Sequence, residues 1–352
     1  MERYIGGDVH QASVTFVVLS ATGRQLREDV IETNGRALVG YLKQLAGSLH
    51  LCIEEGEWSN WLFEILSPHV AEFVVYRQQW RPGPKSDAID ARGLAEKLRK
   101  GEIKSPVYKT TAYRELREAA RVYTKLTRDA ARVKCRIKSV YRSRGLPYKG
   151  SEVFKDEKRQ RHIKRLPAFL RGPVTLLGEE LDQLSALKGL AEQQMIKASH
   201  QLKISRILET APGMGPVRVA QMIPIVVTPH RFRTKRQFWS YCGFAIVTRS
   251  SSDWVRENKQ WIKSKKVIQT RGLSFNHNRM LKMIFKGAAT TVIAHSGSNP
   301  LRSGYDRQLD NGTKPNLAKL TVARKVAAIV LAMWKNEEKY DAERLVAAQA
   351  TG

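Results

Sequence analysis

The first 76 residues alternate between two kinds of apolar pattern, and this alternation limits the folds open to the chain. Short apolar or alternating runs typical of strands lie at Tyr4–Asp8, Ser13–Leu19, Gln25–Ile31, His50–Ile53 and Glu72–Tyr76. Helical spacing of apolar residues occupies Arg36–Ala46 and Trp58–Leu66. This order of elements predicts an α/β domain, a mixed sheet with helices on its faces.

The stretch from Lys85 to Arg92 carries a pair of acids. Asp87 and Asp90 stand three residues apart where a helical pattern begins, so both should project from one face of the helix. Two carboxylates at the positively polarised start of a helix can share a Mg²⁺ ion. Alternatively, Ser86 or Asp87 is the helix N-cap and Asp90 is an ordinary first-turn acid.

Two further acids lie at strand ends. Asp8 ends the first predicted strand and Glu54 follows the fourth, and open α/β sheets build sites where neighbouring strands end. Glu55 and Glu57 are rivals of Glu54, which taken alone is equally well explained as a solvated strand end. The four acids form an acidic tetrad suited to two Mg²⁺ ions that clamp a scissile phosphate: Asp8, Glu54, Asp87 and Asp90.

The middle of the chain is helical and rich in Lys and Arg, with two apolar seams at alternating three- and four-residue steps. Their members are Leu116, Tyr123, Leu126, Ala130, Val133, Ile137 and Val140, then Val174, Leu177, Leu181, Leu184, Leu187, Ala191, Met195 and Ala198. The seams predict an elongated stalk, either a hairpin within one chain or a coiled coil between chains. Basic side chains beside them, among them Arg132 and Arg136, are expected to follow phosphates of DNA or RNA.

Charge narrows the class of partner. The chain has 61 Lys+Arg against 33 Asp+Glu, a formal net charge of +28, which points to a polyanion. No apolar run approaches the roughly 20 residues of a membrane span, so nucleic acid is a simpler partner than a membrane. The start of the chain has no apolar signal-peptide core, and Cys52, Cys135 and Cys242 show no zinc or redox spacing. We therefore expect a cytoplasmic protein with buried, reduced thiols.

A change of composition near Ile204 marks a third, mostly helical region. A turn at Pro212–Gly215 opens a helical run, Val217–Ile225. The backbone N–H groups of Gly213 and Gly215 are expected to bind a phosphate at this helix start. A plain tight turn is the alternative.

A triple serine is the second candidate for chemistry. Ser250, Ser251 and Ser252 follow Arg249, and a serine hydroxyl in basic surroundings can attack a phosphodiester and stay covalently attached to the broken strand. Serine clusters are more usually loops. His277 has no acid nearby in sequence, which favours a phosphate contact over a general base.

Several blocks resemble the DEDD transposases of the insertion-sequence one-hundred-ten family. The N-terminal blocks are Ile5–His10, Glu54–Gly56 with Trp61-Leu62, and Lys85–Ala91; the C-terminal blocks are Pro212–Gly215, Tyr241–Phe244 and Asn278–Lys282. The resemblance implies an N-terminal domain similar to the RuvC junction nuclease, of RNase H type, with Asp8, Glu54, Asp87 and Asp90 as its tetrad. It also implies a covalent serine nucleophile, which counting from Gly243 places at Ser251.

The chain departs from the family pattern near this serine. Ile246 stands where a proline is usual and Ser252 where a glycine is usual, so Ser250 and Ser252 remain alternatives to Ser251. The family further implies a structured guide RNA, two DNA duplexes, a homo-oligomer (dimer or tetramer), and a prokaryotic, nucleoid-associated protein whose acids and serine meet between protomers.

These observations predict a DNA transposase or recombinase with a RuvC-like domain at residues 1–106, a basic helical stalk at 107–203 and a C-terminal transposase domain at 204–352. Lys85, Arg92 and Arg249 are expected phosphate contacts. No Walker motif occurs, as expected if a covalent phosphoserine conserves bond energy. The alternatives are a metal-dependent junction nuclease with structural serines and a non-catalytic nucleic-acid-binding protein; a membrane-surface protein is a more distant one.

Overall fold

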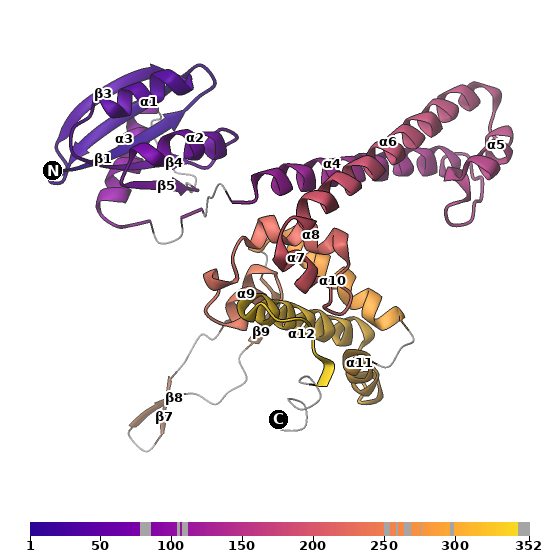
Figure 1. The fold of residues 1–352 in the computed structure, drawn as a ribbon. Coiled ribbons are helices and arrows are strands. Elements are labelled where there is room, and N and C mark those ends of the chain that lie inside the picture. The colour runs from indigo at the N-terminus through magenta and orange to yellow at the C-terminus, as the bar shows by residue number, and fades with distance from the viewer. Residues whose placement is uncertain are drawn as a thin grey trace. The chain divides into compact units, whose positions relative to one another are not determined.

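The computed structural model describes residues 1–77, 86–103, 106–107, 112–249, 254–257, 260–263, 269–274, 276–295 and 299–343. The chain divides into two compact units, Met1–Ala112 and Tyr113–Gly352, whose elements are labelled in Figure 1. The boundaries at 106 and 203 remain predictions. Within the described ranges, no helix is long and apolar enough to cross a membrane.

The N-terminal unit contains a five-stranded sheet with the order β3-β2-β1-β4-β5. Its elements are β1 (Glu2–Val9), β2 (Ser13–Ser20), β3 (Gln25–Glu32), α1 (Gly35–Lys43), β4 (Ser48–Glu54), α2 (Ser59–Leu66), η1 (Ser67–His69), β5 (Glu72–Tyr76) and α3 (Asp87–Arg99). β1, β2 and β3 are antiparallel to their neighbours, whereas β4 and β5 continue the sheet in parallel with β1. The predicted mixed α/β domain is confirmed.

Helices cover both faces of this sheet. One face presents Ile5 and Leu51 to a core shared with α1 and α2, and the opposite face packs against Ala91 and Ala95 of α3. Gly6 of β1 makes the second contact possible, because a Cβ at this position would lie 1.8 Å from the Ala91 carbonyl oxygen. The backbone of α3 therefore rests directly on the backbone of β1.

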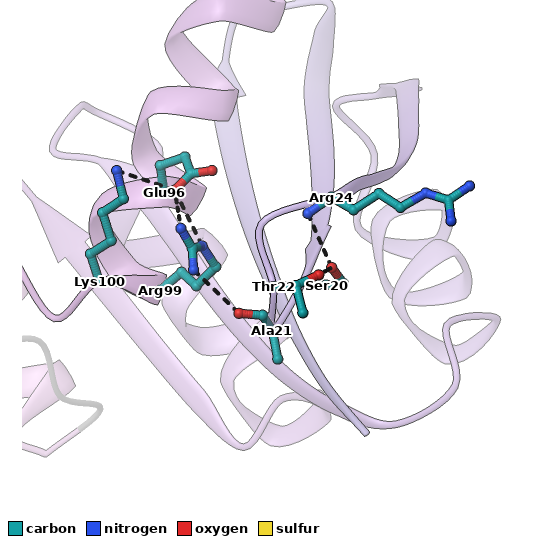
Figure 2. Close-up of polar contacts among 7 residues, drawn as sticks. All are labelled: Ser20, Ala21, Thr22, Arg24, Glu96, Arg99 and Lys100. Carbon is teal, nitrogen blue, oxygen red and sulfur yellow. Dashed lines mark hydrogen bonds and ion pairs between the residues drawn. The ribbon is translucent and has the colours of Figure 1, made fainter.

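The C-terminal end of α3 is tied to the turn between β2 and β3 (Figure 2). Arg99 donates from Nη1 to the Ala21 carbonyl oxygen at 3.2 Å and from Nη2 to the Glu96 carboxylate at 2.8 Å. The Ser20 hydroxyl accepts the Arg24 backbone N–H at 3.1 Å, which braces the turn that receives this contact. These bonds fix where α3 sits along the sheet, and hence where its first turn lies.

A histidine bridges three strands of the sheet and makes stability depend on pH. His50 of β4 hydrogen-bonds the Glu2 carboxylate through Nε2, and its Nδ1 lies 2.9 Å from a Glu72 carboxylate oxygen. Burial lowers the pKa of His50, but the bonds to Glu72 and Glu2 outweigh burial and raise the pKa above its ordinary value. A raised pKa means that the protonated ring stabilises the fold below about pH 6.5, and that this contribution is lost as pH rises through the raised value.

We therefore expect His50→Gln to lower the melting temperature by a few degrees at about pH 6 and to have no effect at about pH 9. Thermal unfolding of the full chain at both pH values measures the difference. A loss of equal size at every pH would show that the ring acts by packing and not by its charge.

The second unit begins with a long helical hairpin. α4 (Arg114–Arg142) and α6 (Ala168–His200) pack side by side along one chain (Figure 1), joined through η2 (Glu152–Phe154) and α5 (Asp156–Lys164). The buried residues toward the connected end are Ala130, Val133, Ile137, Tyr141, Val153, Ile163, Leu166, Val174 and Leu181. The chain thus adopts the intrachain hairpin, and a coiled coil between chains remains a prediction.

Two details of the predicted burial are wrong. Leu187, assigned to the second seam, is 51% exposed. The inward line of α6 runs instead from Leu184 through half-buried Lys188 to Ala191, because alternating steps of three and four residues stay on one face of a helix, whereas two successive steps of three residues drift off it. Cys135 is exposed while Cys52 is buried, because Cys135 lies on the side of α4 opposite its buried seam.

The remainder of the second unit is mainly helical, as predicted. Its helices are α7 (Lys203–Leu208), α8 (Pro216–Val226), η3 (Pro229–Arg231), α9 (Lys235–Tyr241), α10 (Arg279–Ala294), α11 (Pro300–Asp310) and α12 (Pro315–Asn336). Their buried side chains form one core with the start of α4 and the end of α6. A two-stranded pair of β6 (Ile246–Arg249) with β9 (Gln269–Leu273) and another of β7 (Trp254–Glu257) with β8 (Gln260–Lys263) interrupt the helices.

Candidate functional site

Strand pairing places Asp8 and Glu54 at the same edge and on the same face of the sheet. β1 and β4 are parallel with Gly7 opposite Ile53, so the next residues along the two strands are Asp8 and Glu54. Gly6 faces α3, and side chains alternate along a strand, so Asp8 lies on the α3 face two residues farther on. The predicted convergence of the strand-end acids is a direct result of this register.

The first turn of α3 contributes the other two acids. Ser86 is the N-cap, and its hydroxyl accepts the Ile89 backbone N–H at 3.3 Å, which leaves Asp87 available for other contacts. Asp87 is more than half exposed, whereas the Asp90 residue is partly buried. The ligand atoms of Asp8, His10 and Asp87 all lie within 4.8 Å of one another, and Glu54 and Asp90 lie outside that group.

His10 is the member of this group that the sequence interpretation missed. Its Nε2 lies 3.1 Å from Asp8 Oδ2 and 3.4 Å from Asp87 Oδ1. Alternation along the strand direction was the available signal, because residues two apart project to the same side. The His10 ring, when protonated, is therefore a positively charged partner that lies between two acids of the predicted tetrad.

The pKa values of this group reflect crowded negative charge. Burial raises the pKa of Asp8, the hydrogen bond to His10 opposes this only in part, and the charges of Asp87 and Asp90 raise it further. The hydrogen bond to Asp8 and the Asp8 charge raise the pKa of His10, with Asp87 adding to both effects. The arrangement favours a cation beside Asp8.

A hard divalent cation fits this donor set. Carboxylate oxygens are the protein ligands that Mg²⁺ prefers, and Asp8 and Asp87 offer two that already approach each other. Imidazole nitrogen suits transition metals better than Mg²⁺. His10 therefore fits the role of a charged hydrogen-bond partner of the acids better than that of a Mg²⁺ ligand.

Four of the predicted residues, one just before α3 and three in the serine segment, lie outside what the structure describes. Lys85 and Ser251, with Ser250 and Ser252 as its alternatives, fall beyond the described residues. Arg249 ends β6, where its backbone pairs with Gln269 of β9. The described strand before the serines, β6, is thus one half of an antiparallel ribbon with β9, and a loop at the serines stays a prediction.

The glycine turn before α8 has a packing explanation. Gly213 has φ +73°, and a Cβ there would lie 2.4 Å from the Ala288 carbonyl oxygen of α10. Its own carbonyl oxygen accepts a hydrogen bond from Arg218 at 2.6 Å. Gly215 is the N-cap of α8 and has open space around its Cα. The tight-turn interpretation accounts for Gly213, and a phosphate contact at this turn stays a prediction.

The predicted basic contacts are exposed but already have polar partners. Arg92 donates to Gln25 Oε1 at 3.1 Å, Arg132 pairs with Asp129 at 2.8 Å, and Arg136 lies 4.0 Å from Glu180. Exposed ion pairs of this kind are weak, so these arginines keep their capacity for phosphate.

A basic groove on α4 was not predicted. A cavity of about 340 Å³ lies between α4, α8 and the start of α10, and apolar side chains such as Pro224 and Met280 line part of its wall. Four cations of α4, spaced three or four residues apart, line the other part: Arg117, Arg121, Lys125 and Arg128. We call this surface the α4 groove; only the helical spacing of its cations could have revealed it from sequence.

Comparison with known protein families agrees with this arrangement. Residues 5–143 match a family model for the DEDD transposases of IS110, described as "Transposase", and residues 205–305 match the model "Transposase IS116/IS110/IS902 family". A search of curated proteins finds no match to the chain. The first match includes β1, β4, α3 and the acids they carry, and a DEDD-type domain indicates dependence on a divalent metal. The two matches together span more than half of the chain, which therefore belongs to the IS110 family of transposases.

Proposed function

We propose that this transposase cuts and rejoins DNA through a covalent phosphoserine, with Mg²⁺ held by Asp8, Glu54, Asp87 and Asp90. The observation that carries the proposal is the meeting of Asp8 and Asp87 at the edge of the sheet, within 4.8 Å. The strand register that sets Glu54 beside Asp8, and the charge of Asp90 felt by Asp8, support adding the other two acids. The mixed sheet order, with the acid on its central strand, supports an RNase H or RuvC-like fold.

The acidic tetrad and Ser251 have different roles in the proposed reaction. When bound, Mg²⁺ would supply positive charge to the scissile phosphate, and the tetrad would orient it. The Ser251 hydroxyl oxygen forms a bond to phosphorus, its proton passes to an acid, and the bond from phosphorus to one bridging oxygen breaks. The released strand end takes up a proton as a hydroxyl. Reversal of these steps with a different strand end completes the exchange without ATP.

The partners are donor and target DNA and a structured guide RNA, bound by a homo-oligomer. The net charge of +28 supports several polyanions at once, because each phosphate contacted must be neutralised. The α4 groove and the exposed arginines of the stalk, Arg132 and Arg136, are the surfaces we assign to their backbones.

A covalent-trapping assay tests the chemistry. We expect the full chain, incubated with Mg²⁺, the transcript flanking its gene and labelled element-end DNA, to give a protein–DNA adduct after denaturation. Peptide mass should place the adduct at Ser251, so Ser251→Ala should abolish it while Ser250→Ala and Ser252→Ala retain it. Cleaved DNA without an adduct would instead establish hydrolysis by activated water, the chemistry of a junction nuclease.

Salt dependence tests the α4 groove. Arg128→Ala is expected to reduce the slope of log K against log salt for duplex DNA by about 1, because one phosphate contact is lost. Arg302→Ala removes the same charge from an arginine of α11 that pairs with Asp306 and does not line the groove, and we expect a smaller change. Fluorescence anisotropy at several salt concentrations gives both slopes, and equal slopes in both variants would argue against a specific role for the groove.

A further inference from the structure

A cavity at the start of α10 has no role in the chemistry described so far. It has a volume of about 620 Å³ and lies between the η3 segment, α9 and the residues that lead into α10. Of the described residues that line it, none is acidic, and they include Arg231, Arg233 and His277. We call it the α10 pocket.

Part of the α10 pocket is lined by a guanidinium group packed against two aromatic rings. The Arg231 guanidinium lies 5.5 Å from the Phe232 ring centroid and 5.4 Å from that of Tyr241, and the two rings are 5.4 Å apart. Arg231 also donates to the Val226 carbonyl oxygen at 3.1 Å, at the end of α8, which holds the guanidinium in place. Guanidinium planes and aromatic rings are the surfaces on which proteins stack unpaired bases.

The lining residues that lead into α10 supply hydrogen-bonding groups at a helix start. Asn278 caps α10 by accepting the Leu281 backbone N–H at 3.0 Å, and Asn276 is exposed beside it. The free N–H groups of a helix's first turn favour a phosphate, and Arg233 is an exposed cation that also lines the cavity. Amide side chains match the edges of bases.

His277 is held among these lining residues by a close contact with a glycine. Its Nδ1 donates to the Ser274 carbonyl oxygen at 2.7 Å, which leaves Nε2 as an acceptor in the neutral ring. Gly243 has φ +75°, and a Cβ there would lie 2.5 Å from the His277 ring. The glycine after Cys242 is therefore required by the wall of the pocket.

The α10 pocket lies where the serine-bearing ribbon leaves the helical core. β6 begins three residues after Gly243, β9 ends immediately before Ser274, and the Ser274 backbone N–H donates to the Ala245 carbonyl oxygen at 3.1 Å. A nucleotide held in this pocket would thus belong to a strand that reaches the root of the ribbon.

We propose that the α10 pocket binds one unpaired nucleotide of the DNA strand to be cut, with its base against Arg231 and Tyr241 and its phosphate near Arg233 and the start of α10. This inference rests on the proposed function, because it assigns the nucleotide to the strand that the serine attacks. It adds a site that reads one extruded base near the cleavage point.

Crosslinking locates the nucleotide. Full-length protein in EDTA is irradiated with octathymidylate that carries one central 5-iodouracil, and crosslinked peptides are identified by mass. We expect the crosslink in the peptides that contain Tyr241 or His277. Crosslinks confined to the stalk helices would overturn the proposal.

Matched variants test the contact energetically. Arg233→Ala is expected to weaken octathymidylate binding about tenfold, the scale of losing one contact in a stacked nucleotide site, and Arg236→Ala on α9, which removes an equal charge outside the pocket, by less than about twofold. Equal losses would show general electrostatic attraction and overturn the pocket. Tighter binding of octauridylate than of octathymidylate would overturn the assignment to DNA.

The outcome is independent of the serine chemistry. Ser251→Ala and Asp8→Asn should bind octathymidylate as the unchanged protein does, because the assay contains no divalent metal and needs no cleavage. Binding in the pocket without a trapped adduct would refute the proposed function and keep the pocket. A trapped adduct with no pocket crosslink would support the proposed function and refute the pocket.

Discussion

Asp8→Asn is expected to lower DNA cleavage at least about 10³-fold, the scale on which one preorganised electrostatic contact to a reacting centre acts. Asp8 lies at the end of the central strand, hydrogen-bonds His10 and is affected by the charges of Asp87 and Asp90. Asparagine keeps its shape but removes the charge that a divalent ion requires. Cleavage rates with labelled element-end DNA measure the loss.

The fold should survive this change. Because burial and neighbouring acids raise the pKa of Asp8, removal of its charge without metal should leave the melting temperature unchanged or slightly higher. Added Mg²⁺ should raise the melting temperature of the unchanged protein but not of Asp8→Asn. Glu57→Gln, which removes an exposed acid beyond Glu54, is the matched control and should cut normally. Full cleavage by Asp8→Asn would show that the acids have a structural role, such as helix capping, and do not act in cleavage.

Gly6→Ala is expected to disrupt the same acidic site by displacing α3, the helix that carries Asp87. Its Cβ would lie 1.8 Å from the Ala91 carbonyl oxygen and 2.8 Å from the Ala95 backbone nitrogen, and both belong to the rigid backbone of α3. Overpacking of a core typically costs about 1–3 kcal/mol, and a clash between two backbones belongs at the upper end of that range. Relief requires α3 to move off the sheet, which carries Asp87 away from Asp8.

We therefore expect Gly6→Ala to lower the melting temperature of the full chain and to reduce cleavage, and Mg²⁺ should restore neither. Gly40→Ala is the control within the same unit, because a Cβ on α1 meets nothing within 4 Å and alanine favours a helix. Differential scanning calorimetry and the cleavage assay read the two effects. Unchanged melting and activity in Gly6→Ala would mean that α3 does not press on β1.

Sequence patterns were sufficient for the sheet and for the positions of its acids. Short apolar or alternating runs located β1 to β5, and strand ends placed Asp8 and Glu54 correctly relative to the sheet. The seams found α4 and α6 and failed only at Leu187, where the assigned three-residue step departs from the alternating three- and four-residue steps of the observed inward line.

Other features depended on contacts that no local pattern records. His10 has one partner two residues away, Asp8, but its other partner, Asp87, lies far along the chain, so the strand pattern alone cannot reveal that second contact. The strands β6 and β9 are short and polar, and their pairing is set by the core to which both ends attach rather than by apolar alternation. The α10 pocket likewise joins η3, α9 and the approach to α10, so its lining residues look like isolated surface positions in the sequence.

The ribbon also bears on how this family of enzymes can diversify. The chain leaves the core at Ala245 and re-enters it at Ser274, and the backbones of these two residues are hydrogen-bonded to each other. The segment between them is therefore attached to the core at one place. Such an appendage can lengthen, shorten or be exchanged between relatives without altering the order of helices that supports it. The acids differ in this respect, because they lie on two strands and a helix that pack on one another, so they must be inherited with the whole domain.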